Sequence, residues 1–213
     1  MINAFSLLKR KPGLTVDAFQ EHWRTEHAEL IRLLPGVRRY VQSHPLVEMY
    51  EDEEPVYDGV AELWGEDSQA FRDIAGSDAY AAVQIDEEKF LDRAATELVL
   101  TEEHIIKDGT VAADGVKCIN LFKRNSDMAV EDFQKHWREI VGPQIAALPS
   151  LDRYAQYAAR LGGYAHGRQP AFDGFDVTWF GSDVEAGALD SQSAFLAGDD
   201  CQRILTRELV IVA

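Results

Sequence analysis

The chain is short of cysteine, of basic residues and of long apolar runs, and each shortage excludes a class of protein. Only Cys118 and Cys201 occur in 213 residues, so neither a disulfide framework nor a thiolate zinc site is indicated. Lysine and arginine number 21 against 37 aspartates and glutamates, which gives a formal net charge of -16. Binding to a phosphate backbone or an anionic membrane needs a basic surface, so we expect neither a nucleic-acid partner nor a membrane partner.

The apolar runs are also too short to span a membrane. The first residues soon reach Lys9, Arg10 and Lys11, which is not the order of a secretory signal, so we expect a cytoplasmic location. Hydrophobic residues make up 46% of the chain and charged residues 27%, as in ordinary globular proteins. Composition does not decide between one large domain and two domains of about 100 residues.

An internal repeat decides that question. The segment FSLLKRKPGLTVDAFQEHWRTEH, which starts at Phe5, returns as INLFKRNSDMAVEDFQKHWREIV from Ile119. Further along, YDGVAELW from Tyr57 returns in the same order as FDGFDVTW. Two segments that match over this length indicate two copies of one fold. We therefore predict two domains, residues 1–110 and residues 111–213.

The periodicity of the first copy changes in a regular order. Thr15 is a suitable N-cap for a helix whose apolar residues recur at spacings of three and four, and Pro35 and Gly36 end it. Alternating or continuous apolar patterns with strand-forming residues flank this helix and a later, broken one. The predicted order is strand, helix, strand, strand, helix, strand, over residues 2–9, 15–34, 37–44, 56–64, 68–90 and 97–106.

This βαββαβ order is typical of a ferredoxin-like half, in which both helices cover one face of a four-stranded sheet. The other apolar face needs a partner, and the second copy can supply it. The predicted fold class is α+β, with two ferredoxin-like βαββαβ repeats whose antiparallel sheets form an intrachain dimeric α/β barrel. Two separate domains are the alternative. Further pairing of this intrachain pseudo-dimer into a homo-oligomer stays open.

The sequence also resembles a known family. KPGLT from Lys11, FQEHWRTEHAEL, LPGVRRYVQSHPL and YDGVAELW together closely resemble the EthD family of dimeric α/β-barrel proteins, and the second copy resembles a diverged second EthD domain. Namesakes of the family accompany oxygenases of ethyl tert-butyl ether degradation, and related barrels include lactone isomerases, polyketide cyclases and cofactorless monooxygenases. The resemblance implies a ligand pocket between the sheet and its covering helices.

Two histidines are the candidate catalytic residues. His27 falls on the apolar face of the first helix with Trp23, and His44 shares one strand face with Tyr40 and Gln42. If that strand face looks toward the helix, two imidazoles, a phenol and an amide converge on one cavity, which suits general acid–base chemistry near neutral pH. The further candidates for substrate binding, beside Trp23 and Gln42, are Ser6, Asp58 and Glu62.

The second copy lacks both histidines, because Val141 and Ala158 stand at their positions. Their joint loss favours a shared function in the first copy, while two packing histidines that drifted to apolar residues are the alternative. His22 persists in both copies, and we interpret it as structural. Its spacing of five residues from His27 does not place two metal ligands on one face of an α-helix.

The sequence therefore predicts a cofactor-independent enzyme that acts by His-mediated proton transfer on a small hydrophobic carbonyl, lactone or aromatic catabolite, with Tyr40 orienting the substrate. It contains no GxGxxG, Walker, GxSxG or HExxH motif, so no cofactor and no metal are indicated. One alternative is a non-catalytic ligand-binding accessory protein to an ether- or aromatic-degrading oxygenase. Another is a cofactorless or haem-dependent oxidoreductase or monooxygenase.

Overall fold

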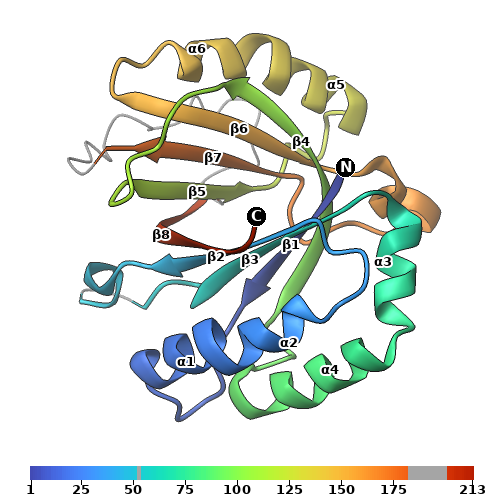
Figure 1. Cartoon of the computed structure of the whole chain (residues 1–213). Coiled ribbons are helices and arrows are strands. Elements are labelled where there is room, and N and C mark those ends of the chain that lie inside the picture. The colour runs from blue at the N-terminus through green and yellow to red at the C-terminus, as the bar shows by residue number, and fades with distance from the viewer. Residues whose placement is uncertain (52–53, 182–200) are drawn as a thin grey trace. The chain divides into compact units, whose positions relative to one another are not determined.

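The computed structural model describes residues 1–51, 54–181 and 201–213, which form a mixed α+β fold with antiparallel strands (Figure 1). The chain divides into two compact units. The first unit contains Met1–Leu100 and Glu208–Ala213, and the second contains Thr101–Arg207. The strand β4 (Glu97–Lys107) begins in the first unit and continues in the second. The division of the sequence into copies at residue 110 stays a prediction.

The first unit contains a sheet in which β3 (Gly59–Gly65) pairs antiparallel with both β1 (Ile2–Leu8) and β2 (Arg39–Pro45). Residues directly opposite one another in an antiparallel pair share one face of the sheet. Ser6 and Gln42 are both opposite Ala61, so these three side chains lie on the same face.

That face of the sheet is covered by helices, and Figure 1 shows α1, α2 and α4 running along it. Thr15 caps α1 as expected, because its hydroxyl accepts a hydrogen bond from the backbone N–H of Ala18 at 3.2 Å. Phe19, Trp23 and Phe90 are fully buried in the core between sheet and helices. The helical elements are α1 (Val16–His22), the π-turn η1 (Trp23–His27), α2 (Ala28–Arg32), α3 (Ser68–Ala75) and α4 (Asp78–Phe90).

The π-turn η1 departs from the single α-helix that the sequence predicts over residues 15–34. A π-turn closes i→i+5 hydrogen bonds and therefore takes in one more residue than an α-helical turn. Residues five apart, such as His22 and His27, then fall on the same side of the helix. A second π-turn, η3 (Trp137–Val141), stands at the corresponding place of the repeat.

The second unit also contains a central antiparallel strand. β7 (Gly174–Phe180) lies between β5 (Val116–Phe122) and β6 (Leu151–Ala159), and β6 pairs in turn with β4, while β5 pairs with β8 (Gln202–Val212). Other helical segments among the described residues are α5 (Val130–His136), α6 (Gly142–Ala146) and the 3₁₀ segments η2 (Val47–Tyr50) and η4 (Leu161–Gly167).

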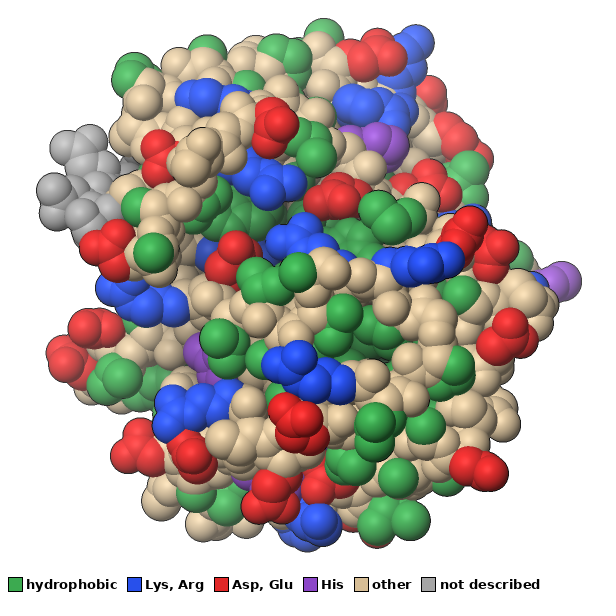
Figure 2. Space-filling model, in the orientation of Figure 1, with side chains coloured by type: hydrophobic (Ala, Val, Ile, Leu, Met, Phe, Trp, Pro, Cys, Tyr) green, Lys and Arg blue, Asp and Glu red, His purple; other side chains and the backbone are tan. Residues whose placement is uncertain are grey.

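All strands and helices predicted for the first copy are present, with ends within a few residues of the predicted ones. None of the helices in the described residues is long and apolar enough to cross a membrane. Figure 2 shows acidic and basic side chains interspersed over the visible face, so the excess of acidic residues does not gather there in one patch.

Candidate active site

A cavity of about 230 Å³ lies in the first unit, between the sheet and its covering helices. Most of its lining is apolar, and an apolar lining with a few polar groups is typical of binding sites for small molecules. The polar residues of the lining, beside the indole of Trp23, are Ser6, His27, Tyr40, Tyr80 and Glu87.

His27 reaches this cavity from the end of the π-turn, and a buried carboxylate orients its ring. Its Nδ1 lies 3.0 Å from Oδ2 of Asp86 on α4. A carboxylate accepts hydrogen bonds, so Nδ1 carries the proton and Nε2 the lone pair. Burial lowers the pKa of His27, and the hydrogen bond that His27 donates to Asp86 offsets this only in part, so the imidazole is neutral at pH 7 and can act as a base.

The hydroxyl of Tyr40 is held by two donors. It accepts hydrogen bonds from Nε1 of Trp23 at 3.0 Å and from Nε2 of Gln42 at 3.2 Å. Within the described residues it donates to no acceptor, so its own proton is available to a molecule in the cavity. Burial raises the pKa of Tyr40 to about 12, which keeps the phenol protonated near neutral pH.

His44 is not part of the cavity lining. Its Nε2 lies 3.0 Å from Oε1 of Gln42, and its ring packs on Trp23 with 4.4 Å between the ring centroids. Tyr40 and His44 share a strand face as expected, but four residues of strand separate them by about 13 Å. The two imidazoles therefore do not meet in one cavity, and His44 instead positions the amide that binds Tyr40.

The other sequence candidates are divided between the two faces of the sheet. Ser6 and Trp23 line the cavity, and their role in substrate binding stays a prediction. Glu62 lies opposite Phe5 on the other face, where it is buried and accepts a hydrogen bond from the hydroxyl of Ser43 at 3.1 Å. The strand register, which the sequence left open, thus takes Glu62 away from the cavity.

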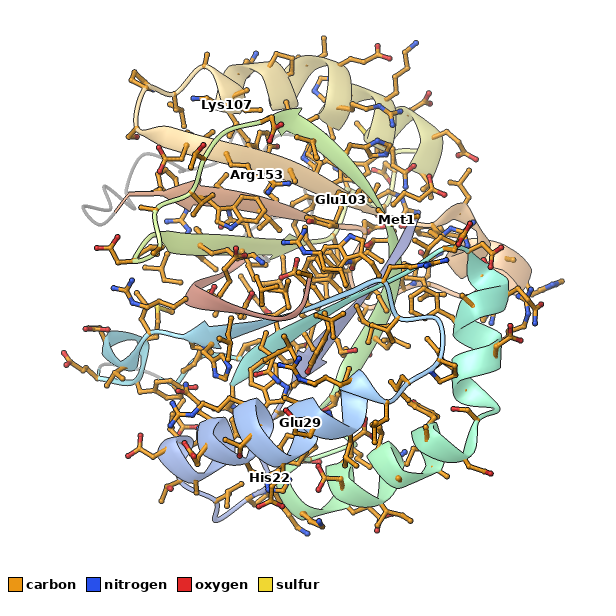
Figure 3. The ribbon with its side chains drawn as sticks, in the orientation of Figure 1. Met1, His22, Glu29, Glu103, Lys107 and Arg153 are labelled. Carbon is orange, nitrogen blue, oxygen red and sulfur yellow. The ribbon has the colours of Figure 1, made fainter. Side chains whose placement is uncertain are left out.

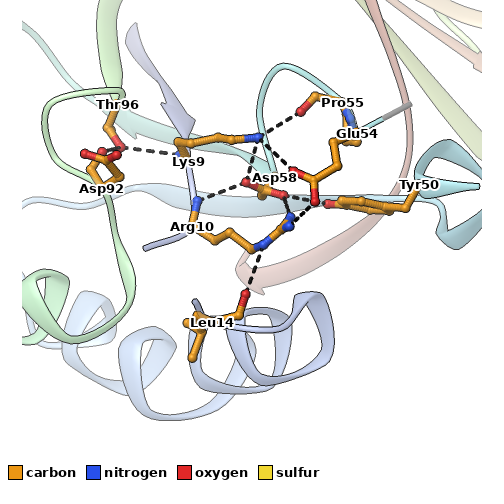
Figure 4. Close-up of polar contacts among 9 residues, drawn as sticks. All are labelled: Lys9, Arg10, Leu14, Tyr50, Glu54, Pro55, Asp58, Asp92 and Thr96. Carbon is orange, nitrogen blue, oxygen red and sulfur yellow. Dashed lines mark hydrogen bonds and ion pairs between the residues drawn. The ribbon is translucent and has the colours of Figure 1, made fainter. Parts of the chain in front are cut away.

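Asp58, the residue just before β3, belongs to a polar cluster that is separate from the cavity (Figure 4). Its carboxylate accepts hydrogen bonds from the guanidinium of Arg10 and from the hydroxyl of Tyr50, and it pairs with Nζ of Lys9 at 3.2 Å. The second copy repeats this arrangement with Asp173, Arg124 and Tyr164. A cluster present in both copies indicates a structural role for Asp58.

Sequence reasoning missed the polar residues that α4 contributes. Tyr80 and Glu87 line the cavity with Val83, at the spacings of three and four that mark one helix face, so this periodicity could have revealed them. Burial raises the pKa of both Tyr80 and Glu87. The contact of Asp86 with His27 joins residues 59 positions apart, and no local pattern predicts it.

The second copy satisfies the corresponding tyrosine internally. Tyr154 accepts a hydrogen bond from Nε2 of Gln156 at 2.8 Å, as Tyr40 does from Gln42, but it donates its own proton to Asp176. Asp176 stands where the first copy has Ala61, and burial raises its pKa to about 7. Of the two tyrosines, only Tyr40 keeps a proton for a ligand.

The part of the sequence that resembles the EthD family also matches that family in a comparison with known proteins. Residues 11–94 match the family described as EthD domain. Among curated proteins, none matches the chain significantly. A crystal structure of an anthrone oxidase-like protein shares 8% identity with a TM-score of 0.66, and the alignment covers 100% of this chain and 94% of that one.

Two further solved structures are similar. One, described as a candidate monooxygenase of Fusobacterium nucleatum, shares 10% identity with a TM-score of 0.60, over 98% of this chain and 92% of its own. The other is an ethyl tert-butyl ether degradation (EthD) family protein of Bacillus halodurans, with 24% identity and a TM-score of 0.41 over 49% of this chain and 100% of its own. At these identities the first of them and the anthrone oxidase-like protein show a shared fold.

Proposed function

We propose that this chain, whose first half carries an EthD domain, is a cofactor-independent enzyme that moves a proton on a small hydrophobic carbonyl, lactone or aromatic compound. One observation carries the proposal. A neutral imidazole, fixed through Nδ1 by Asp86, and a phenol with an unshared proton line the same apolar cavity of the first unit. Proton abstraction next to a carbonyl group requires a base and a hydrogen-bond donor, and here both belong to the lining of one apolar cavity.

The chemistry needs no oxidant and no added group. The substrate oxygen accepts a hydrogen bond from Tyr40, while Nε2 of His27 takes a proton from the carbon next to the carbonyl group. The electron pair of that C–H bond moves to the oxygen, where Tyr40 stabilises the developing negative charge. Return of the proton from His27 to a different carbon completes an isomerisation, and its return to the same carbon gives exchange with solvent.

Three other residues position these two groups. Asp86 holds the tautomer of His27 and stabilises the imidazolium that forms when His27 takes the proton. Gln42 donates from Nε2 to the backbone oxygen of Trp23 at 2.7 Å as well as to Tyr40, and its Oε1 is held by His44. These three are positioning residues, because they contact His27, Tyr40 or each other but do not line the cavity.

The experiment is deuterium exchange at carbons next to the carbonyl group, followed by NMR in D2O with a panel of small cyclic ketones and lactones. We expect exchange to fall by about 100-fold or more in His27→Ala and in Tyr40→Phe, because each removes a group that acts on the reacting atoms. The matched control is Tyr154→Phe, which removes the tyrosine whose proton Asp176 already takes.

One outcome would contradict the proposed mechanism, and another would contradict an enzyme. Exchange that is equal in the wild type and in His27→Ala would remove His27 as the base. Binding of panel members to the wild type without any exchange would favour the ligand-binding accessory protein instead. The change in tryptophan fluorescence measures this binding, because Trp23 lines the cavity.

The finer features of the fold belong to the same proposal. The two units would be the two ferredoxin-like copies of one covalent α/β barrel in the cytoplasm. The π-turns at Trp23 and at Trp137, and the repeated glutamine that binds a tyrosine hydroxyl, support two copies.

A further inference from the structure

A cluster of side chains of the types that bind metal ions includes Asp86 and lies outside the lining of the cavity. One ring nitrogen of His22 and one oxygen each of Glu26 and Asp86 lie within 4.8 Å of one another. Figure 3 shows His22 on the side of α1 beside which α4 runs. Neither the sequence motifs nor the proposed proton transfer uses His22 or Glu26.

The geometry of this cluster is close to that of a metal site. Nε2 of His22 lies 3.0 Å from both carboxylate oxygens of Asp86, and Nδ1 of His22 lies 3.7 Å from Oε2 of Glu26. Neighbouring ligand atoms around a cation with bonds of about 2.1 Å stand about 3 Å apart, so His22 and Asp86 are already at ligand spacing. Glu26 faces the other ring nitrogen of His22, so its side chain, which is 69% exposed, has to turn toward Nε2 to complete the set.

The π-turn and the burial of Asp86 explain why the cluster exists. Because η1 takes five residues, His22 and His27 both reach Asp86, each with a ring nitrogen 3.0 Å from Oδ2. The side chain of Asp86 is only 3% exposed, and a buried carboxylate needs compensating positive charge. Lys89 supplies this charge at Oδ1, at 3.0 Å, from a side chain that is 58% exposed.

We propose that His22, Glu26 and Asp86 bind a borderline divalent cation such as Zn²⁺, Co²⁺ or Ni²⁺, with water completing the coordination. One imidazole and two carboxylates form the mixed nitrogen and oxygen donor set that these cations accept. The cation takes the place of the Lys89 ammonium at Oδ1, while Oδ2 keeps its contact with His27. The ion therefore joins η1 to α4 outside the cavity.

The second copy provides an internal contrast. It keeps the histidine as His136, but Ile140 stands at the position of Glu26. A histidine without a carboxylate four residues later lacks one of the three ligands. The second copy is therefore not expected to bind the ion, and His136 gives a control for non-specific binding to a surface imidazole.

The test is calorimetric titration of the untagged full chain with ZnCl2 at pH 7. We expect one Zn²⁺ per chain, with affinity reduced at least 10-fold in Glu26→Gln and in His22→Asn, and unchanged in His136→Asn. Lys89→Met should tighten binding several-fold, because it removes the ammonium that competes for Oδ1.

Equal affinity of the wild type and Glu26→Gln, or the absence of Zn²⁺ binding, would overturn this inference. Glu26 is exposed, so Glu26→Gln is expected to fold, and thermal unfolding of the metal-free chain checks this. The titration needs no substrate. Deuterium exchange measured in EDTA tests the proposed function separately, so failure of one proposal is distinguishable from failure of the other.

Discussion

His44 is the residue whose protonation should be visible in the pH dependence of stability. Burial, with a smaller contribution from the charge of Arg24, lowers its pKa from 6.5 to about 4. Below pH 6.5 His44 becomes protonated in the unfolded chain, whereas in the folded chain it stays neutral until about pH 4. The free energy of unfolding should therefore fall across this range, by on the order of 2–3 kcal/mol.

The measurement is urea unfolding of the wild type and of His44→Ala at pH 7 and at pH 4.5. Ala158 shows that the repeat accepts alanine at this position. We expect a smaller loss of stability on acidification in the variant. Asp176 acts in the opposite direction, because its folded-state pKa of about 7 makes stability fall as pH rises above 3.8. Asp176→Asn serves as the control, and equal acid sensitivity of wild type and His44→Ala would contradict the role of His44.

At the scale of the elements, helix and sheet are in close contact where each tryptophan ring packs on a glycine of the sheet. A Cβ at Gly59 would stand 2.5 Å from the ring of Trp23, and one at Gly174 would stand 2.7 Å from the ring of Trp137. Both indoles are buried and cannot move away freely. The helix is therefore held at a distance from the strand that only glycine permits.

Gly59→Ala and Gly174→Ala should each reduce the free energy of unfolding by about 1–3 kcal/mol, the usual cost of overpacking a core. Chemical denaturation measures this loss. Gly163→Ala is the matched control, because nothing lies within 4 Å of a Cβ there. A loss at Gly163 as large as at Gly59 would show that glycine removal itself, rather than contact with the indole, is responsible.

At the scale of the whole molecule, the two copies differ in the strand residue at the position of Ala61 and Asp176, near the tyrosine hydroxyl. Ala61 leaves room for the cavity in the first unit, whereas Asp176 takes the hydrogen bonds of Tyr154 and Trp137 in the second. Ala61→Asp should reproduce the second copy's arrangement in the first. The new side chain would accept a hydrogen bond from the hydroxyl of Tyr40 and occupy part of the cavity.

We expect Ala61→Asp to lower deuterium exchange to the level of Tyr40→Phe while the chain stays folded at pH 5, where a buried carboxylic acid is protonated. Asp176→Ala, the reverse change in the second unit, should leave exchange unchanged. Full exchange in Ala61→Asp would mean that the reaction does not use this cavity.

The sequence by itself determined the repeat, the order of the elements and the candidates Tyr40, Trp23 and His27, because periodicity and internal similarity are properties of the chain alone. It also suggested that the second copy lost its site. Only the tertiary structure decided which groups meet. The π-turn moved His22 beside Asp86, the strand register took Glu62 to the opposite face, and the length of β2 kept His44 out of the cavity. These outcomes depend on contacts between residues far apart in the chain, and no local pattern encodes them.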